Sequence, residues 1–550
     1  MARWEWVAVG LLGAWLTIAM VWRWPAFSRQ WFRGDTLVDL AFYAYAGDLV
    51  RMGGTPYVTF WDHKPPLIFL LHAAGLTLSG GRVWGVWLVS YLALMTAAWC
   101  GFRAMRHVFG PAPAVLGLTF FAFSVPNISA FGLTEWFALP TAWVAALVTL
   151  RRDPREQNPL LLGAALGALG AVALLFKPNL IGGPLVGGLV ASVLLLADRR
   201  VSAWARLVAG GALGGAVVLG PMLGYLVATG AFGAFRDQVL DYNRLYVATG
   251  PGWRMRLRAL DAGISSTTAF TSAVLPLAGW ALAVQQLLRR GLRAPLAPAL
   301  FMAVAWLPAE FVFALTSGRD YAHYFAPCFA PLALLVAYVG YEIVAATAPD
   351  AAAGRVPRRA GTALIPVLCA TLAAFGIWRM AWRERNDLSP ALRATQVHAA
   401  ADYVRRHLHA GEPVFVWGHA ADVYMFSGHR PASRFLYVQP LLTPGYATPA
   451  RVHAFVDELR TSAPPIIIDA GGRDQNTRAI DGGDITPPLG HMDSTWSYPR
   501  VVQPNWKGPS WWSMPGTMRE FYDFVAANYV PVDSVGPAKW VVYRRVMSGT

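Results

Sequence analysis

Residues 325–346 read FAPCFAPLALLVAYVGYEIVAA, and Glu342 is the single charged residue of this stretch. A helix needs about 20 mostly apolar residues to cross about 30 Å of hydrocarbon, because each residue advances it by about 1.5 Å. Three more apolar runs approach or reach this length, at 7–22, 83–101 and 180–197. The sequence therefore predicts a chain that crosses a membrane several times.

The composition of the chain points the same way. Of its 550 residues, 55% are hydrophobic and only 14% are charged, whereas about a quarter of an ordinary soluble protein is charged. The net charge of +15 comes from short basic clusters between apolar runs, which argues against a nucleic-acid partner. The three cysteines, Cys100, Cys328 and Cys369, have neither metal-ligand nor disulfide-like spacing.

Apolar runs and the residues that break them predict eleven membrane spans, within a fold of about 11–13 membrane helices. The first run lacks a small-x-small cleavage site, so we interpret it as a helix and not as a signal peptide. The run at 67–78 is too short to cross and follows two prolines, so we expect an interfacial helix there. The predicted spans are 5–22, 83–101, 112–127, 133–150, 160–176, 179–197, 204–229, 268–288, 297–315, 324–347 and 361–380.

The arginines test this count, because loops on the cytoplasmic side of a membrane protein are enriched in Lys and Arg. With the N-terminus inside, the five predicted cytoplasmic turns are all basic. Their arginines are Arg103 and Arg106; Arg151, Arg152 and Arg155; Arg199, Arg200 and Arg206; Arg289, Arg290 and Arg293; and Arg355, Arg358 and Arg359. The longer loops, at 23–82 and 230–265, then lie outside, so we expect the active face of this cell-membrane protein to be extracytoplasmic.

The composition changes near residue 384. Strand-sized apolar stretches at 414–417, 435–438, 466–468 and 540–543 alternate with helix-like segments at 391–408 and 449–459. Residues 471–517 are rich in Gly, Pro, Asp and Trp, which predicts a long irregular region. We therefore expect a membrane domain at 1–383 and an extracytoplasmic α/β domain at 384–550.

The first external loop, 23–82, carries candidate polar residues. If residues 37–51 are helical, Asp39 and Tyr43 lie one turn apart, and Leu37, Leu40 and Ala41 belong to an apolar face. This pattern predicts an amphipathic helix on the membrane surface with a carboxylate near its start. The same loop continues with a Gly-Gly-x-Pro-Tyr turn at 53–57 and with Trp-Asp-x-Lys-Pro-Pro at 61–66.

Three further motifs follow at or beside the outer ends of predicted spans: LTEWFALP at 133–140, which begins a predicted membrane helix, FKP at 176–178 and GRDYAHYF at 318–325. Taken in order with the first loop, they resemble bacterial glycosyltransferases of the GT-C fold that are related to protein O-mannosyltransferases and to the lipid A aminoarabinose transferase. The segment from Val416 to Pro431 resembles the start of that family's periplasmic domain. The resemblance thus covers nearly the whole chain.

The resemblance implies an activity. In that family, the acid of the first loop is taken as the base that deprotonates an acceptor hydroxyl, which then attacks the anomeric carbon of a sugar held on a polyprenyl phosphate. Its counterpart here is Asp39, and Asp35 is the second candidate. A single displacement inverts the anomeric carbon, and cations stabilise the departing phosphate. The acceptor would be a hydroxyl of a lipid, a glycan or a protein.

Other residues of these motifs are candidates for substrate binding, and each has a structural alternative. Glu135 would position the acceptor or pair with a basic residue. Lys177 is a phosphate ligand or a lysine that extends toward the membrane surface. The remaining candidates are Tyr43; Arg319, His323 and Tyr324, for a lipid phosphate or as interfacial anchors; Lys64, in a site with Asp62 and His63 or in a structural turn; and Arg244, in the 230–265 loop.

The sequence gives no sign of a metal or a cofactor, because it has neither His-Glu-x-x-His nor paired Cys-x-x-Cys. It also lacks a glycine-rich loop after a strand, which favours a lipid-linked donor over a nucleotide sugar. Two alternatives remain open: a transporter or flippase of a lipid-linked substrate, and a noncatalytic GT-C-like subunit.

Overall fold

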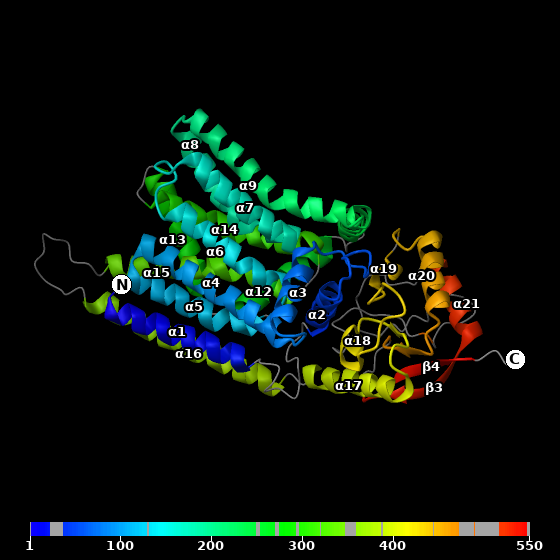
Figure 1. Cartoon of the computed structure of the whole chain (residues 1–550). Helices are drawn as coiled ribbons and strands as arrows, with labels where there is room; N and C mark the ends of the chain where they lie inside the picture. Colours follow the sequence, from blue (N-terminus) through cyan, green and yellow to red (C-terminus); the bar gives the residue numbers. More distant parts are fainter. Residues whose placement is uncertain are drawn as a thin grey trace, which may run out of the picture.

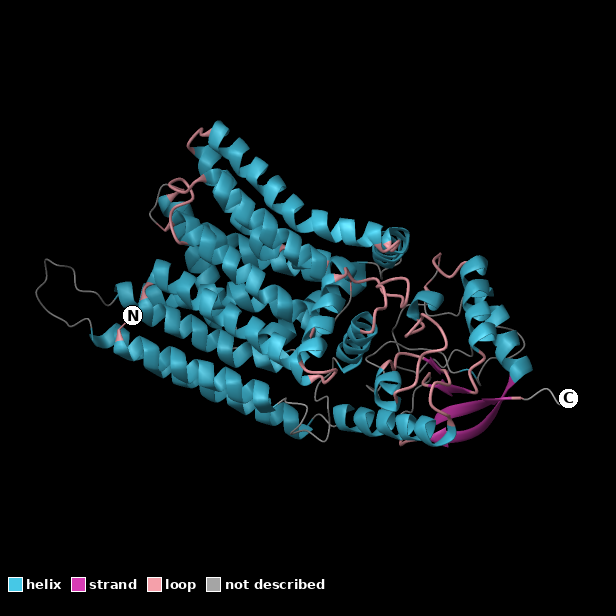
Figure 2. Ribbon diagram, viewed as in Figure 1, coloured by secondary structure: helices cyan, strands magenta, loops and turns pink. Residues whose placement is uncertain are grey.

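A bundle of long helices makes up one end of the computed structural model, and a smaller part that holds the described strands makes up the other end (Figure 1). Figure 2 shows that the described strands all lie at this second end, together with further helices. The structure describes residues 2–22, 37–128, 131–248, 253–269, 274–292, 296–318, 321–346, 359–386, 389–443, 445–471, 489 and 516–546.

Each of the eleven predicted spans overlaps at least one helix among the described residues. Seven of the described helices are long and apolar enough to cross a membrane: α1 (Arg3–Trp22), α4 (Trp84–Phe109), α7 (Pro159–Phe176), α9 (Val201–Ala228), α14 (Ala297–Ala314) with η3 (Leu315–Ser317), η4 (Ala322–Cys328) with α15 (Phe329–Ala346), and α16 (Arg359–Asn386). The other four spans are α5 (Pro111–Ile128), α6 (Thr134–Leu150), α8 (Gly182–Ala197) and α13 (Val274–Arg290). The protein is therefore a multi-pass membrane protein, as predicted.

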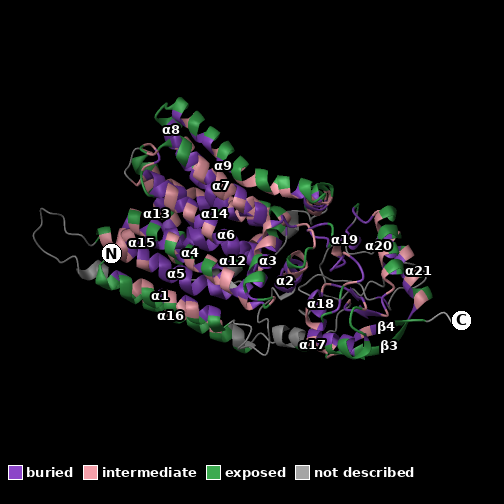
Figure 3. Ribbon diagram, in the orientation of Figure 1, coloured by how far each residue is buried: buried purple, intermediate pink, exposed green. Residues whose placement is uncertain are grey.

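Burial separates central from peripheral helices (Figure 3). Helix α15 is buried along most of its length, whereas α9 and α16 expose most of theirs. The exposed side chains of α9 include Val208, Leu213 and Val217. Apolar side chains on the outside of such a bundle suit contact with lipid chains.

Glycines bring α7 and α9 into close contact. A Cβ added at Gly163 on α7 would overlap the carbonyl oxygen of Leu207, and one at Gly214 on α9 would overlap that of Ala164. Helices in membranes use small residues in this way, because association there depends on close packing and not on the hydrophobic effect.

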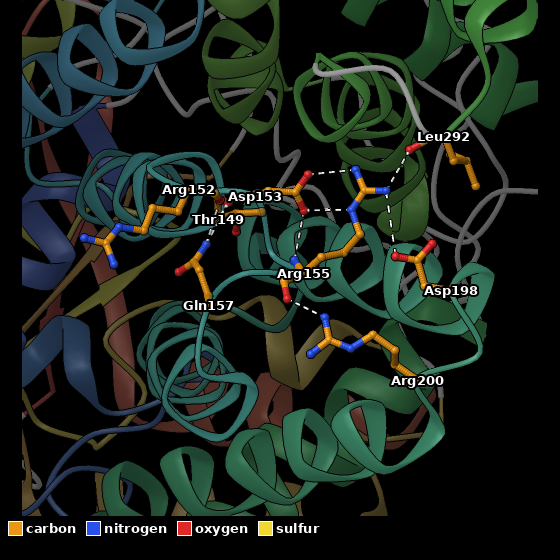
Figure 4. Close-up of polar contacts among 8 residues, drawn as sticks. All are labelled: Thr149, Arg152, Asp153, Arg155, Gln157, Asp198, Arg200 and Leu292. Atoms are coloured by element: carbon orange, nitrogen blue, oxygen red, sulfur yellow. Dashed lines mark hydrogen bonds and ion pairs between the residues drawn. The ribbon is translucent and has the colours of Figure 1, made fainter.

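Three of the arginine-rich turns meet at the end of the bundle away from the sheet (Figure 1), and Figure 4 shows the contacts among them. Arg155, after α6, binds both Asp153 oxygens, lies 3.9 Å from Asp198 after α8, and donates to the carbonyl of Leu292 after α13. Arg200 donates to the carbonyl oxygen of Arg155. Three turns that the sequence assigns to one side of the membrane are thus joined by direct contacts.

The C-terminal part is an α/β unit with a four-stranded sheet in the order β1-β2-β4-β3. Its strands are β1 (Val414–Trp417), β2 (Ile466–Asp469), β3 (Tyr529–Val535) and β4 (Trp540–Arg545). Strands β1 and β2 are parallel, with Val414 opposite Ile466, and the other two pairings are antiparallel. Its helices are α17 (Ser389–His407), α18 (Asp422–Ser427), α19 (Gln439–Leu442), α20 (Pro449–Ser462), α21 (Arg519–Asn528) and the short η7 (Gly516–Met518).

The prediction of a strand at 435–438 is wrong. Residues 435–438 are buried but form no strand, and the backbone N–H of Trp61 donates to the carbonyl oxygen of Arg434, just before them. Their apolar side chains pack against the first loop instead of lying in the sheet. Nearly all of the predicted irregular region at 471–517 lies outside the described residues.

Helices α2 (Leu37–Arg51) and α3 (Leu67–Leu78) match the predicted segments and lie between the bundle and the C-terminal part (Figure 1). The prediction of a surface helix with one apolar face is wrong for α2, because residues 40–47 are all buried. Phe42 packs edge-on against Tyr437, and Tyr45 stacks on Tyr424. The C-terminal part covers the face that an amphipathic helix on the membrane surface would expose to water. The remaining helices are η1 (Pro178–Leu180), α10 (Phe232–Phe235), η2 (Arg236–Asp241), α11 (Tyr242–Ala248) and α12 (Trp253–Ala269).

Candidate functional site

Asp39, in the first turn of α2, lies beside His323, in η4. The distance between Asp39 Oδ2 and His323 Nε2 is 3.8 Å, and the Asp39 side chain is 33% exposed. His323 is buried and stacks on Tyr321, with 5.7 Å between the ring centres. A partly exposed carboxylate is thus held against a buried imidazole.

Lys177 lies at the corner between α7 and η1. Pro178 disfavours helical backbone at the residue before it, and Lys177 is extended, with φ −168° and ψ 131°. Helix α7 therefore ends here, and the lysine reaches α6. Its Nζ lies 2.7 Å from Oε1 of Glu135 and 3.4 Å from the centre of the Tyr324 ring.

Glu135 is buried at the start of α6, with 1% of its surface exposed. Its Oε2 accepts a hydrogen bond from the Thr134 hydroxyl at 2.9 Å, so both oxygens have partners. Of the two roles considered for Glu135, pairing with a basic residue is the one seen. Electrostatic interaction also links Glu135 to His323.

Tyr43 lies in the same region as the two pairs, because the charges of Asp39 and Glu135 both act on its phenol. It lies one turn after Asp39 on α2 and is buried. Burial, together with the negative charges of Asp39, Asp62 and Glu135, holds the pKa of the Tyr43 phenol well above its ordinary value. Tyr43 therefore presents a neutral hydroxyl in this region.

Residues 62–64 of the first loop add a second lysine. Asp62 Oδ1 accepts the backbone N–H of Lys64 at 2.6 Å, and Nζ of Lys64 lies 2.9 Å from Nε2 of His63. Gln238 of η2 braces the loop by accepting the N–H of Asp62 and donating to the carbonyl of Tyr57. Burial raises the pKa of Asp62 to about 6, against the opposing effect of the Lys64 charge.

The C-terminal part also reaches this loop. The Tyr437 hydroxyl lies 3.1 Å from Nδ1 of His63 and 3.3 Å from Oδ2 of Asp62. The sequence did not single out Tyr437, and no local motif marks it, because its position depends on how the C-terminal part packs on the first loop.

The other predicted site residues lie elsewhere or outside the description. The Arg244 side chain is 80% exposed, and its ion pair is with Asp241 at 3.5 Å, so this arginine is not joined to the cluster. Asp35 and Arg319 lie outside the described residues. Within the described part of the chain, no group of three or more His, Cys, Asp and Glu side chains is placed to hold a metal ion.

A second buried acid in the bundle was also missed. Glu310 of α14 is 2% exposed, its Oε1 accepts from the Trp306 indole N–H at 2.8 Å, and its Oε2 has no hydrogen-bond partner among the described residues. A Cβ at Gly182, the first residue of α8, would overlap this carboxyl group.

Comparison with solved structures gives the fold. The crystal structure of ArnT from Cupriavidus metallidurans bound to undecaprenyl phosphate covers all of this chain and 99% of ArnT, at a TM-score of 0.55 and 16% identity. Its apo structure covers 98% of this chain and 99% of ArnT, at a TM-score of 0.52 and the same identity. ArnT is a lipid A aminoarabinose transferase of the GT-C class. The chain has the GT-C fold.

This GT-C chain also matches the oligosaccharyltransferase AglB from Archaeoglobus fulgidus, solved with an inhibitory peptide and a dolichol-phosphate. That match has a TM-score of 0.48 and 12% identity, and covers 85% of this chain and 69% of AglB. The sequence of the GT-C chain matches no protein-family model and no curated protein.

Proposed function

We propose that this protein is an integral-membrane glycosyltransferase that moves a sugar from a polyprenyl phosphate to a hydroxyl of a lipid, glycan or protein. The observation that carries the proposal is one cluster: the Asp39 carboxylate beside His323, next to the buried Lys177–Glu135 pair. A transfer of this kind needs a base for the acceptor and cations for the departing phosphate. The cluster offers both.

Asp39 is the base in this proposal. Its side chain is open enough to meet an acceptor hydroxyl, unlike the buried Glu135 and Asp62. His323 Nε2 lies 3.8 Å from Oδ2 of Asp39 on one side. A single displacement at the anomeric carbon then gives an inverted product, with the acceptor proton on Asp39 and the leaving electrons on the phosphate oxygen.

Lys177 and Lys64 are the phosphate ligands. The positive charge of Lys64 acts unfavourably on the Lys177 ammonium group, so the two lysines lie in one region of the protein. Charge-assisted hydrogen bonds from two ammonium groups stabilise a phosphate without requiring it to be protonated. The similar ArnT structure, which holds undecaprenyl phosphate, supports a donor of this class.

The site would work on the extracytoplasmic face. The three joined arginine-rich turns lie at the other end of the bundle, and turns of this kind favour the cytoplasmic side. The C-terminal part would then lie outside with the site.

A transporter or flippase of a lipid-linked substrate is the second candidate, favoured by one observation. Glu310 is a buried carboxyl inside the bundle with an unpartnered oxygen, and acids within membrane helices often belong to transport pathways. The residues of the candidate site, in contrast, lie at one end of the bundle.

One experiment separates the two. Polyprenyl-phosphate sugars and a cell-envelope acceptor fraction are added to the purified protein in proteoliposomes. Three quantities are measured: released polyprenyl phosphate, sugar on the acceptor, and movement of the intact lipid-linked sugar across the bilayer. We expect stoichiometric release and transfer. Movement of the intact lipid-linked sugar across the bilayer with no transferred sugar would reject the enzyme in favour of the transporter.

A further inference from the structure

We infer that the C-terminal part completes the phosphate-binding site, with Tyr437 as a positioning residue that acts on Lys64 through His63. This inference rests on the proposed function, because it gives a task to a lysine that the proposal makes a phosphate ligand. It adds a residue from outside the membrane domain to the site.

The contacts form one unbroken chain from the C-terminal part to the lysine. The Tyr437 hydroxyl contacts Asp62 Oδ2 at 3.3 Å and His63 Nδ1 at 3.1 Å, and His63 Nε2 contacts Lys64 Nζ at 2.9 Å. Tyr437 is 3% exposed and Asp62 is 2% exposed, so water competes little for these bonds.

The chemistry of the groups fixes the direction of each bond. An ammonium group has only donors, so Lys64 donates and Nε2 of His63 accepts. The neutral imidazole then carries its proton on Nδ1 and donates it to the Tyr437 oxygen. The Tyr437 O–H is left to donate to the Asp62 carboxylate. Only one assignment of the protons gives each of the three contacts a donor and an acceptor. In that assignment, one N–H bond of Lys64 points at Nε2 of His63.

The ring of Tyr437 is held independently of its hydroxyl. His419 stacks on it, with 4.8 Å between ring centres, and Phe42 of α2 packs edge-on against it at 5.2 Å. Removal of the oxygen alone therefore leaves the packing in place.

The C-terminal part is also docked by other bonds. The Trp61 indole N–H donates to the Tyr446 hydroxyl at 2.9 Å, which in turn donates to Oδ2 of Asp237 at 2.6 Å. The Trp61 backbone N–H donates to the carbonyl of Arg434 at 2.9 Å. The docking of the C-terminal part therefore does not depend on the Tyr437 hydroxyl alone.

The test uses Tyr437→Phe in the full-length protein. Loss of a hydrogen bond in a chain that ends on a charged group is expected to raise KM for the polyprenyl-phosphate sugar, and Kd for undecaprenyl phosphate alone, about tenfold. kcat should stay within about twofold. His63→Gln breaks the same chain at another residue and should give the same rise. Tyr529→Phe, which removes a buried hydroxyl bond to the Pro464 carbonyl, is the control and should change neither constant.

A double variant tests whether Tyr437 acts through the lysine. In a Lys64→Met background, Tyr437→Phe should have no further effect on KM, because the group it positions is gone. Unchanged KM and Kd in Tyr437→Phe would overturn the inference, as would a tenfold effect that persists in the Lys64→Met background. A wild-type protein that neither transfers sugar nor binds undecaprenyl phosphate would overturn the proposed function as well.

Discussion

Lys177 Nζ lies 2.7 Å from Glu135 Oε1, between the end of one membrane helix and the start of another. Both side chains are largely buried, at 12% and 2% exposure. Taking two charges out of water is expensive, so the pair is held by its mutual attraction, by the Thr134 hydroxyl and by the Tyr324 ring. This contact joins parts of the chain that the sequence could only align as separate motifs.

Breaking this pair from one side should destabilise the fold more than removing it altogether. Glu135→Gln leaves a buried ammonium group without its counter-ion, which costs about 3–5 kcal/mol in comparable pairs. The double variant Glu135→Gln/Lys177→Met leaves no buried charge and should unfold at a higher temperature than Glu135→Gln. Thermal unfolding of the detergent-purified protein measures both. A double variant that is less stable than Glu135→Gln would contradict this account of the pair.

Asp469 should make the stability of the C-terminal part depend on pH. It lies at the end of β2 and accepts the N–H groups of Gly471 and Leu489, yet burial raises its pKa to about 7. An unfolded Asp ionises near pH 4. Between about pH 4 and 7 the unfolded chain therefore releases a proton that the folded chain keeps, so this group's contribution to stability falls as pH rises and is constant above about 7.

The measurement is the unfolding temperature at pH 4.5 and 7.5. We expect Asp469 to lower the unfolding temperature of the wild type as the pH rises from 4.5 to 7.5. The unfolding temperature of Asp469→Asn should decrease less over the same range. Asp457→Asn, at an exposed residue paired with Arg460, should keep the wild-type decrease. Equal pH dependence in wild type and Asp469→Asn would show that this carboxyl titrates at its ordinary pKa.

The α7–α9 contact should not tolerate a methyl group. Gly163→Ala places a Cβ on the Leu207 carbonyl oxygen, so the helices must separate. Overpacking of this kind costs about 1–3 kcal/mol. Gly220→Ala, on α9 where a Cβ meets nothing within 4 Å, is the control. The measurement is the unfolding temperature of the two variants, and we expect a lower value for Gly163→Ala. Equal values would mean that the close contact does not contribute to stability.

Much of the membrane domain follows from the sequence, because long apolar runs in lipid have few alternatives to helix. The boundaries of α2 and α3 also match the prediction. The burial of residues 40–47 of α2 does not follow from the sequence. Their apolar and aromatic side chains pack against the C-terminal part, which the local pattern does not reveal. The sequence pattern cannot tell such a partner from a membrane surface.

The errors in the C-terminal part have similar causes. The apolar run at 435–438 resembles a buried strand but packs against Trp61 through side chains. Strand β3 was missed, because it is an edge strand whose residues between Tyr529 and Val535 are exposed and include Pro531. A strand is recognised in a sequence by its apolar, buried residues, and an exposed edge strand has few of them.

The candidate site was predicted in part. Collinear motifs pointed to Asp39, Tyr43, Glu135, Lys177, His323 and Tyr324, and the structure brings these residues together. Tyr437 lies far from them in sequence and has no motif, so its contact with Asp62 and His63 could come only from the packing of the two parts.

The most direct test of the account is the rate of polyprenyl-phosphate release by Asp39→Asn. Asp48→Asn serves as control, because Asp48 lies on the same helix and pairs with Arg51 at 2.7 Å. If Asp39 is the base, Asp39→Asn should lower kcat by about 10²- to 10⁴-fold while binding of undecaprenyl phosphate changes little, and Asp48→Asn should retain wild-type activity. A fully active Asp39→Asn would contradict the central claim.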